Sequence, residues 1–393
     1  MRESEISQAS VRDLKGLINE ASHGRISRRQ FVVRALGLGL SAGTVGGLLA
    51  ACGGGDGEAG PSASPTPMDT TKPEKLLLYN WSNYMTPDIK KGFKQKHGIS
   101  IQETFFDDNE ALLGKLKSGA TGYDVIIPTN YMVQIMVHTG LLLPLDMKYI
   151  PNFSYVGEKF AKPSYDTWPD GKKYSVPYQW GTTALSVRTD KVPEEVTSWT
   201  TLWDERYKNQ IDMLNDERDT PGVALRKNGY SINTTNQAEL DRATDDLIVQ
   251  KPLVLQYDSL NMKRNIIAGV ALVMTWNGDC LLAMQAVGED KVSYVFPTEG
   301  YSVWVDNMCN PVGSPSPYAA HLFMDYLCDP KVNADLTNWN QYSSPIPEAD
   351  QYTNKFILDQ LPTPEELERG EFLNDVGAFG RNYTEAWAKV KSA

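Results

Sequence analysis

The chain has 393 residues, of which 41% are hydrophobic and 22% charged, and its formal net charge at pH 7 is −11. At about 150 residues per domain, this length predicts two domains of a soluble globular protein. A surface this acidic repels nucleic acid, so we expect no nucleic-acid partner. The first 51 residues run against this balance, because they carry seven basic and four acidic residues.

The N-terminal segment has the organisation of an export signal. Arg28 and Arg29 precede an apolar stretch rich in Gly and Ala at 35–51, and this arginine pair makes the segment resemble a twin-arginine signal peptide. The residues around Cys52 resemble the cleavage box of bacterial lipoproteins, in which this cysteine becomes the lipidated first residue. We therefore predict a twin-arginine lipoprotein signal at 1–51, with an uncleaved membrane anchor as the alternative. Either one places the body in the periplasm, or otherwise outside the cytoplasmic membrane, and tethers it to that membrane.

The segment that follows the signal has the composition of a linker. Residues 52–74 are rich in Gly, Pro, Ser and Thr and lack apolar periodicity. We predict a flexible tether that holds the folded body away from the membrane. The folded body then begins near residue 75.

From residue 75 onward, stretches with strand periodicity alternate with stretches of helical periodicity. The expected strands are 76–79, 100–106, 124–127, 183–187 and 269–275, and the expected helices are 87–97, 111–117, 130–139, 199–207 and 237–250. Alternation in units of this size predicts an α/β fold with a parallel sheet. The aromatic-rich stretch 174–182 lacks a helical period, and we predict that it is an extended crossing between two lobes.

The first strand of the body ends in aromatic and polar residues. The apolar run at 76–78 leads into Trp81 and Tyr84, and Pro87 begins the next helix. Ligands of open α/β sheets bind beyond the carboxyl ends of the strands. The two rings therefore offer π faces for a sugar or an organic cation, and core filling at the end of a strand is the alternative.

A pair of carboxylates stands in the middle of the chain. Asp216 and Asp219 are three residues apart, so they share one face of a helical turn. Such a pair suits acid–base chemistry, as in glycosidases, or the binding of ammonium groups. An exposed charged turn is the alternative.

Two further stretches place a Trp beside an Asp. Trp276 and Asp279 follow the apolar strand expected at 269–275. Trp304 and Asp306 are two residues apart, and residues two apart in an extended segment lie on one face. A ring with a carboxylate at its side makes a surface for a cation. A core Trp304 with Asp306 capping a turn is the alternative.

Neither the cysteines nor the motifs point to a metal, a cofactor or a reaction. The four His are far apart, no zinc-binding spacing occurs, and we find no nucleophile elbow, phosphate loop or dinucleotide fingerprint. We expect no cofactor, no metal and no enzyme activity. The body contains Cys280, Cys309 and Cys328, for which we predict a disulfide between Cys309 and Cys328; buried unpaired thiols are the alternative.

Six short motifs, taken together and in order, resemble those of the polyamine-binding proteins, the spermidine/putrescine receptors of bacterial ABC importers. They are found at 79–84, 129–131, 224–231, 276–279, 304–306 and 374–377. The resemblance covers 75–393. It implies a two-lobed periplasmic-binding-protein fold of type II, with the ligand in the cleft between the lobes and two crossover segments. The lobes are then expected at 75–180 plus 306–350 (lobe 1) and at 181–305 plus 351–393 (lobe 2).

The resemblance also implies the residues of the ligand site. They are an aromatic box of Trp81, Tyr84, Tyr131, Trp276, Trp304 and Tyr342, the carboxylates Asp216, Asp219, Asp279 and Asp306, and the polar wall residues Ser82 and Thr129. Three positions depart from the spermidine-type pattern: Asp219 replaces a Glu, Asp258 replaces a Ser, and Leu373 replaces a ligand-binding Gln. We include Asp258 in the expected site as an added charge. The preferred polyamine stays open, although the number of carboxylates favours spermidine over putrescine.

The expected function is extracytoplasmic polyamine binding and delivery to an ABC permease. The expected partners are the polyamine, the permease and, through a lipid on Cys52, the membrane, and the chain is expected to be a monomer. A binding protein of the same fold for another organic cation or a sugar is the first alternative. An acidic-pair glycoside hydrolase is the remote one. Transport and sensing both stay open as the task.

Overall fold

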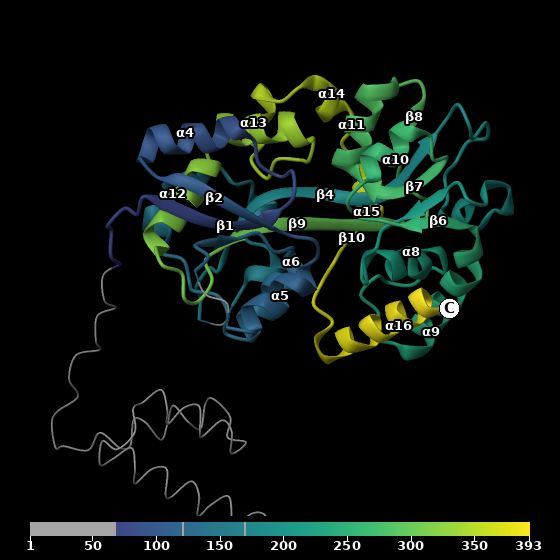
Figure 1. The fold of residues 1–393 in the computed structure, drawn as a ribbon, viewed down its shortest axis with the longest axis horizontal. Coiled ribbons are helices and arrows are strands. Elements are labelled where there is room, and N and C mark those ends of the chain that lie inside the picture. The colour runs from purple at the N-terminus through teal and green to yellow at the C-terminus, as the bar shows by residue number, and fades with distance from the viewer. Residues whose placement is uncertain (1–67, 120–121, 169) are drawn as a thin grey trace, which may run out of the picture. The chain divides into compact units, whose positions relative to one another are not determined.

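The computed structural model describes residues 68–393 apart from 120, 121 and 169, and these residues belong to one compact unit (Figure 1). The predicted signal peptide at 1–51, the predicted lipidation site Cys52 and the tether up to residue 67 lie outside the described residues. Among the residues that are described, no helix is both long enough and apolar enough to cross a membrane.

A mixed sheet runs through this unit (Figure 1). Its strands are β1 Lys75–Trp81, β2 Ser100–Phe106, β3 Val125–Ile126, β4 Ser175–Arg188, β5 Ile211–Met213, β6 Val254–Tyr257, β7 Leu272–Trp276, β8 Val292–Val295, β9 Tyr301–Cys309 and β10 Gly370–Phe372. Their order is β2-β1-β3-β9-β4-β7-β5-β6, with β10 beside β9 and β8 beside β4. The blocks β2-β1-β3 and β7-β5-β6 are each parallel, whereas β9 and β4 are antiparallel to each other and to the blocks that they join.

Strand β4 carries the chain from one parallel block to the other. It is 14 residues long, so the predicted crossing at 174–182 and the predicted strand at 183–187 form one continuous strand. Strand β7 starts at Leu272, later than predicted, because Gly269 first ends the preceding helix in the left-handed conformation, with φ of 95°. Glycine adopts this conformation at little cost.

Helices cover both parallel blocks. They are α4 Pro87–His97, α5 Asn109–Lys117, α6 Asn130–His138, α7 Glu158–Ala161, α8 Asp219–Lys227, α9 Gln237–Gln250, α10 Met262–Ala268, α11 Asn277–Val287, α12 Pro317–Leu327, α13 Pro330–Asn340, α14 Lys355–Asp359, α15 Pro364–Arg369 and α16 Gly380–Ser392. The helices predicted at 87–97 and 237–250 are confirmed. Those predicted at 111–117 and 130–139 are confirmed with their ends shifted by one or two residues.

Capping side chains explain why the helix predicted at 87–97 is confirmed and why the helix predicted at 199–207 is wrong. Helix α4 begins where the Thr86 side chain accepts a hydrogen bond from the Ile89 amide, and it ends at Gly98 with φ of 78°. The single helix predicted at 199–207 is wrong, because this stretch forms two short 3₁₀ helices, Trp199–Trp203 and Glu205–Tyr207. The Asp204 side chain caps the second of them, and a capping Asp competes with a continuous helix.

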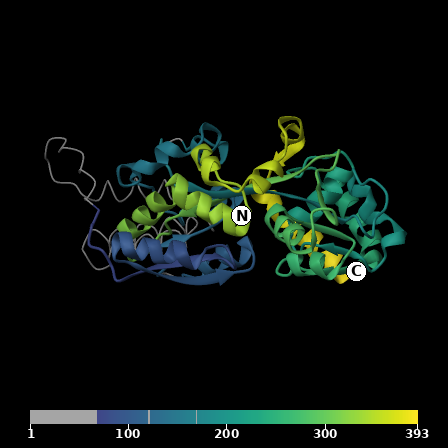
Figure 2. The same cartoon turned by 90° about the horizontal axis from the view of Figure 1, so that it is seen from above.

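The buried side chains fall into separate clusters. One cluster, around Phe93 and Phe323, takes all its members from the residues predicted for lobe 1, and another, around Trp199 and Met274, takes all of its members from those predicted for lobe 2. Figures 1 and 2 show the same division, since α4, α12 and α13 lie on one side and α8, α10, α11 and α16 on the other. The lobe boundaries in the sequence stay a prediction, and below we use lobe 1 and lobe 2 in that sense.

The predicted disulfide is wrong. Cys280, Cys309 and Cys328 are all free and buried. Cys309 packs in a cluster with Tyr131 and Met136, whereas Cys328 packs in the cluster of Phe93 and Phe323. The two thiols therefore fill space in different parts of the core, and burial raises the pKa of each.

Candidate ligand-binding site

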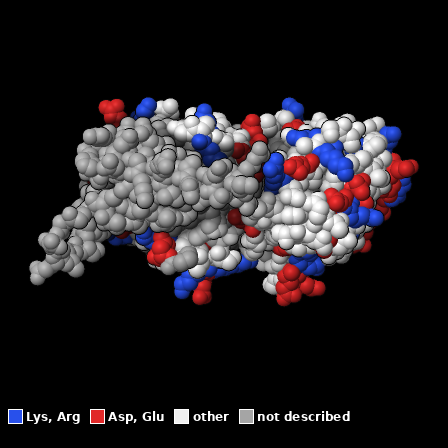
Figure 3. Space-filling model, turned by 90° about the horizontal axis from the view of Figure 1, so that it is seen from below, with Lys and Arg blue, Asp and Glu red and all other residues white. Residues whose placement is uncertain are grey.

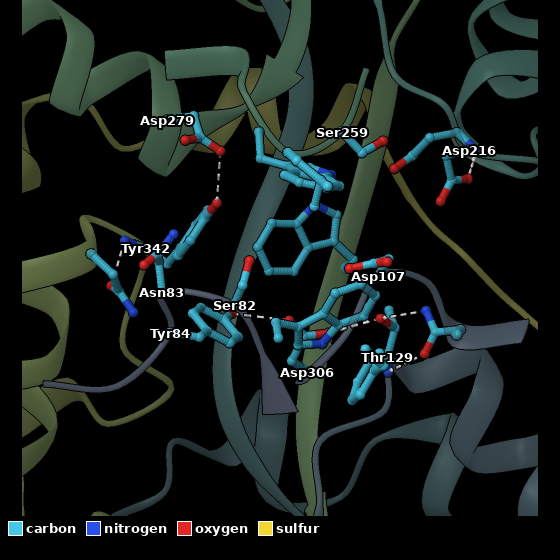
Figure 4. A pocket seen from close by; sticks show the side chains of 18 of the residues that line it. Ser82, Asn83, Tyr84, Asp107, Thr129, Asp216, Ser259, Asp279, Asp306 and Tyr342 are labelled. Carbon is cyan, nitrogen blue, oxygen red and sulfur yellow. Dashed lines mark hydrogen bonds between the residues drawn. The ribbon is translucent and has the colours of Figure 1, made fainter. Parts of the chain in front are cut away.

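Twelve of the thirteen predicted ligand-binding residues line one cavity of about 310 Å³ (Figure 4). They are Trp81, Ser82, Tyr84, Thr129, Tyr131, Asp216, Asp219, Trp276, Asp279, Trp304, Asp306 and Tyr342. They come from strand ends, loops and first helical turns of both lobes and from the middle of strand β9, and ligands of α/β sheets commonly bind beyond strand ends. The cavity has the size of a site for a small molecule.

Asp306 lies in the middle of the cavity, on strand β9. It is 6% exposed. The Tyr84 hydroxyl donates to its Oδ2 at 2.9 Å, and the Thr129 hydroxyl donates to its Oδ1 at 2.7 Å (Figure 4). Burial raises the pKa of Asp306 to about 7, although both hydrogen bonds oppose this rise. Among the described residues, these two hydroxyl groups are the hydrogen-bond donors to the Asp306 carboxylate, and no ion pair holds it, although Lys263 and Arg264 line the same cavity.

Asp279 lies on another side of the cavity, in the first turn of helix α11. The Tyr342 hydroxyl donates to its Oδ2 at 3.4 Å. Burial raises the pKa of Asp279 to about 6, and the charge of Lys263, which also lines the cavity, acts in the opposite direction. Figure 4 shows Asp279 and Asp216 on opposite sides of the view, with Asp306 below and between them. The four predicted carboxylates that line the cavity therefore lie at three separate places in it.

The third place is the start of helix α8. Asp216 Oδ1 accepts the Arg218 and Asp219 amides at 2.8 and 2.7 Å, so Asp216 orders the turn that leads into the helix. The Asp219 carboxylate accepts hydroxyl hydrogen bonds from Thr183, at 2.9 Å, and from Ser302. Burial, followed by the charge of Asp216, raises the pKa of Asp219 to about 7. The pair thus lies on one side of the cavity, and the exposed turn that was the alternative is excluded, since Asp219 is buried.

Aromatic rings lie between these carboxylates. Tyr342 packs edge-on against both Trp304 and Tyr84, with ring centroids 5.3 Å apart in each pair. Trp81 donates its indole N–H to the Ile127 carbonyl at 2.9 Å, which fixes that ring at the end of strand β1. Such rings provide an apolar surface that also tolerates a positive charge.

Tyr131 lines the cavity but also serves the protein itself. Its hydroxyl donates to Glu110 Oε1 at 3.0 Å, and the guanidinium of Arg218 lies 5.2 Å from its ring centroid. Arg218 comes from lobe 2 and Tyr131 from lobe 1. One face of this ring therefore already contacts a cation across the cleft.

Asp258 does not line the cavity, so its inclusion in the expected site is wrong. Its Oδ1 accepts the amides of Leu260 and Asn261 at 2.8 and 3.3 Å, and its Oδ2 accepts from the Asn265 side chain at 3.4 Å. The carboxylate therefore orders the loop before helix α10. Its neighbour Ser259 lines the cavity instead (Figure 4).

Several lining residues were missed by the sequence interpretation. Asp107 follows the end of strand β2, and the rule that drew attention to Trp81 could have found it. Asn109 exchanges two hydrogen bonds with Thr129, of 3.0 and 3.1 Å, and so holds the hydroxyl that contacts Asp306. Lys263 and Arg264 gave no signal, because their approach depends on how helix α10 packs. Leu373 lines the cavity with an apolar side chain, as expected at this departure from the family pattern.

The face of the molecule in Figure 3 carries charges of both signs. On the face in Figure 3, acidic and basic side chains are interspersed wherever grey atoms do not cover the surface. The buried carboxylates of the cavity are thus distinct from the general acidity of the chain, because burial and not number makes them strong sites for a cation.

The arrangement of the sheet and the position of the cavity define a class of protein. Two α/β lobes, joined by the long strands β4 and β9 and enclosing a polar and aromatic cavity, are the type II periplasmic-binding-protein fold. Residues 88–363 match the family described as bacterial extracellular solute-binding protein. The chain belongs to this family.

Individual relatives agree with the family. The chain is 32% identical over 323 residues to the spermidine/putrescine-binding periplasmic protein of Escherichia coli, a match that covers 81% of this chain and 91% of the relative. Among solved structures, it resembles a putative spermidine/putrescine ABC transporter protein from Listeria monocytogenes, with TM-score 0.77 and 29% identity over 81% of this chain and 99% of that one. A lipoprotein of Treponema pallidum has TM-score 0.74 and 28% identity over 80% and 99%. The resemblance noted in the sequence is thereby confirmed.

Proposed function

We propose that this protein binds a polyamine, such as putrescine or spermidine, outside the cytoplasmic membrane and delivers it to an ABC permease. The relatives support this proposal by their names, since one binds spermidine and putrescine in the periplasm. The site supports it by its chemistry. We also propose that the protein is a monomer without enzyme activity, held at the membrane by a lipid on Cys52.

The observation that carries the proposal is Asp306. A buried carboxylate with two hydroxyl donors and no cation is costly to ionise, and its pKa of about 7 reflects that cost. An ammonium group offsets the free-energy cost of ionising Asp306, because it forms a charge-assisted hydrogen bond with the carboxylate where water is excluded. Every nitrogen of a polyamine that enters the cavity needs such a partner, and Asp279 and Asp219 offer two more.

The aromatic rings accommodate what lies between the nitrogens. A polyamine consists of methylene segments beside positive charges, and Trp304 and Tyr342 can contact both. Each cation–π contact contributes about 0.5–2 kcal/mol. A sugar, the first alternative, also stacks on such rings, but it gives no counter-charge to Asp306.

A thermal-shift panel on the purified protein tests the proposal. The panel contains putrescine, spermidine, spermine, choline, glucose and maltose, each at about a hundredfold excess over the dissociation constant expected for a receptor. Polyamines should raise the melting temperature, because a ligand at 100 Kd adds about 2.7 kcal/mol of stability. A shift with a sugar or with choline, and none with any polyamine, would refute the proposed ligand class.

A further inference from the structure

Two glycines lie directly behind two rings of the cavity. Gly181 is in strand β4, and its cross-strand partner in β9 is Trp304. Gly278 is in the first turn of helix α11, next to Tyr342. The described glycines with a positive φ do not include these two. The conformational freedom of glycine therefore does not explain why these positions lack a side chain.

Space explains them better. A Cβ atom on Gly181 would lie 2.5 and 2.6 Å from two carbons of the Trp304 ring, and it would also strike the Asn277 amide oxygen. A Cβ atom on Gly278 would lie 2.7 Å from two carbons of the Tyr342 ring and 2.6 Å from the Asn340 carbonyl. Carbon atoms do not approach this closely without contact becoming repulsive, since their optimal separation is about 3.5–4.0 Å. With a side chain at 181 or 278, both the ring and the oxygen atom beside it would have to shift.

Each ring has its glycine on one side and borders the cavity on another. Trp304 is 6% exposed and lies over β4 on one side and beside the cavity on the other. Tyr342 follows Gln341, which ends helix α13 with φ of 62°, and its amide is held by Asn340 at 3.1 Å. The backbone holds both residues in place, so we infer that a ring displaced by a Cβ moves toward the cavity and narrows it.

We propose that Gly181 and Gly278 are positioning residues of the ligand site, because they provide the sockets in which the Trp304 and Tyr342 rings rest. A ring in its socket leaves the middle of the cavity free for an alkyl amine. It also aims the Tyr342 hydroxyl at Asp279, at 3.4 Å. This inference rests on the proposed function, in that the ligand is taken to be a polyamine.

Double-mutant cycles test the proposal by measuring whether each glycine acts through its ring. The variants are Gly278→Ala, Tyr342→Ala and the combination, together with Gly181→Ala, Trp304→Ala and their combination. The matched control is Gly114→Ala in helix α5, where an added Cβ meets nothing within 4 Å. Calorimetry with putrescine and spermidine gives the affinity of each folded variant, and thermal melting gives its stability.

Each glycine substitution alone should weaken binding at least tenfold, whereas the control should bind within twofold of the unmodified protein. In the background that lacks the ring, the same glycine substitution should weaken binding less than twofold further, because interacting positions are not additive. Unchanged affinity of the single glycine variants would overturn the proposal. So would a loss of affinity that persists in full after the ring has been removed.

Stability supplies an independent readout. The added Cβ also meets the Asn277 amide oxygen or the Asn340 carbonyl, so part of the lost stability should persist without the ring. The proposal requires that removing the ring recovers at least half of the lost melting temperature, and a loss of equal size with and without the ring would overturn it. If the unmodified protein binds no polyamine, the proposed function fails. The double-mutant cycle is then evaluated from the melting temperature alone. If the glycine-to-alanine substitution lowers the melting temperature equally with and without the ring, the proposed role of the glycines is refuted.

Discussion

At the scale of single residues, the central feature is a carboxylate that the protein buries without a cation. Asp306 accepts two hydroxyl groups and nothing stronger. Burying an unpaired charge costs much free energy, so such a carboxyl group stays protonated until a cationic group binds beside it. Such a group favours a ligand that brings a cationic hydrogen-bond donor, of which an ammonium is one.

Asp306→Asn should remove most of the affinity for polyamines. The amide keeps the shape of the side chain but leaves a buried ammonium without its counter-charge, which costs about 3 kcal/mol or more. Calorimetry should therefore show an affinity more than a hundredfold lower, at a melting temperature similar to that of the unmodified protein. Asp258→Asn is the matched control, because Asp258 does not line the cavity, and it should bind normally. Equal affinity of Asp306→Asn and the control would contradict the assignment.

Binding should also depend on pH, because the raised pKa values of Asp306 and Asp219 mean that the empty site holds protons. Both are about 7, above the value near 4 of an exposed Asp. The ligand requires the ionised form, so affinity should rise from about pH 5 to about pH 8 and then level off. Calorimetry in two buffers of different ionisation enthalpy should detect protons released at about pH 6 and few at about pH 8.5. A pH-independent affinity without proton release would refute this expectation.

The raised pKa values of Asp306 and Asp219 also affect the stability of the protein without ligand. Because the folded pKa of each group is above the unfolded one, the folded state binds more protons between about pH 4 and about pH 7. These two groups therefore destabilise the empty protein progressively as pH rises through that window. Ligand binding removes this penalty.

The sequence predicted the residues of the site well where they follow a strand and poorly where packing decides. Trp81, Trp276 and Asp306 were found because strand ends and strand alternation can be read from the pattern of residues. Asp258 was placed wrongly, because only the fold shows that its carboxylate turns back to the Leu260 and Asn261 amides.

At the scale of elements, caps decide where the helices that carry the site begin and end. Helix α4 follows the loop that holds Ser82 and Tyr84, and it ends at Gly98. Capping residues of this kind are visible in the sequence, which is why 87–97 and 237–250 were predicted correctly. The stretch 199–207 misled the prediction, because its periodicity suits a helix while Asp204 interrupts it.

Gly98→Ala should destabilise the protein without changing its affinity for polyamines. Nothing lies within 4 Å of a Cβ at this position, so the cost is the left-handed backbone alone, about 1–2 kcal/mol for a residue with a side chain. Urea unfolding measures it. The matched control Gly114→Ala lies inside helix α5 without a positive φ and should be stabilising by up to about 1 kcal/mol. Shifts of the same sign in both variants would contradict this account of the cap.

At the scale of the whole molecule, the site lies between two lobes that each have a buried cluster of their own. Asp306, Thr129 and Tyr84 come from lobe 1, whereas Asp216, Asp219 and Asp279 come from lobe 2. A ligand that touches both groups binds the closed arrangement better than an open one, which is how ligands drive hinge closure. The alternation of strands and helices predicted the α/β class, whereas the two-lobed architecture was implied by the resemblance to a known family. The core position of each cysteine did not, because sequence spacing carries no information about which cluster a thiol enters.

Closure should be visible in solution. Small-angle X-ray scattering of the purified protein should show a smaller radius of gyration when spermidine or putrescine is added in excess. Asp306→Asn should show no such change at the same ligand concentration, because its affinity is too low. A radius of gyration that stays constant although calorimetry shows saturation would mean that the lobes do not move on binding.

A crystal structure of the protein grown with spermidine or putrescine is the most direct test of the central claim. We expect a ligand nitrogen about 2.7–2.9 Å from a carboxylate oxygen of Asp306, the distance of a charge-assisted hydrogen bond, with methylenes against Trp304 and Tyr342. A ligand bound elsewhere, or a cavity in which no nitrogen reaches Asp306, would contradict the account.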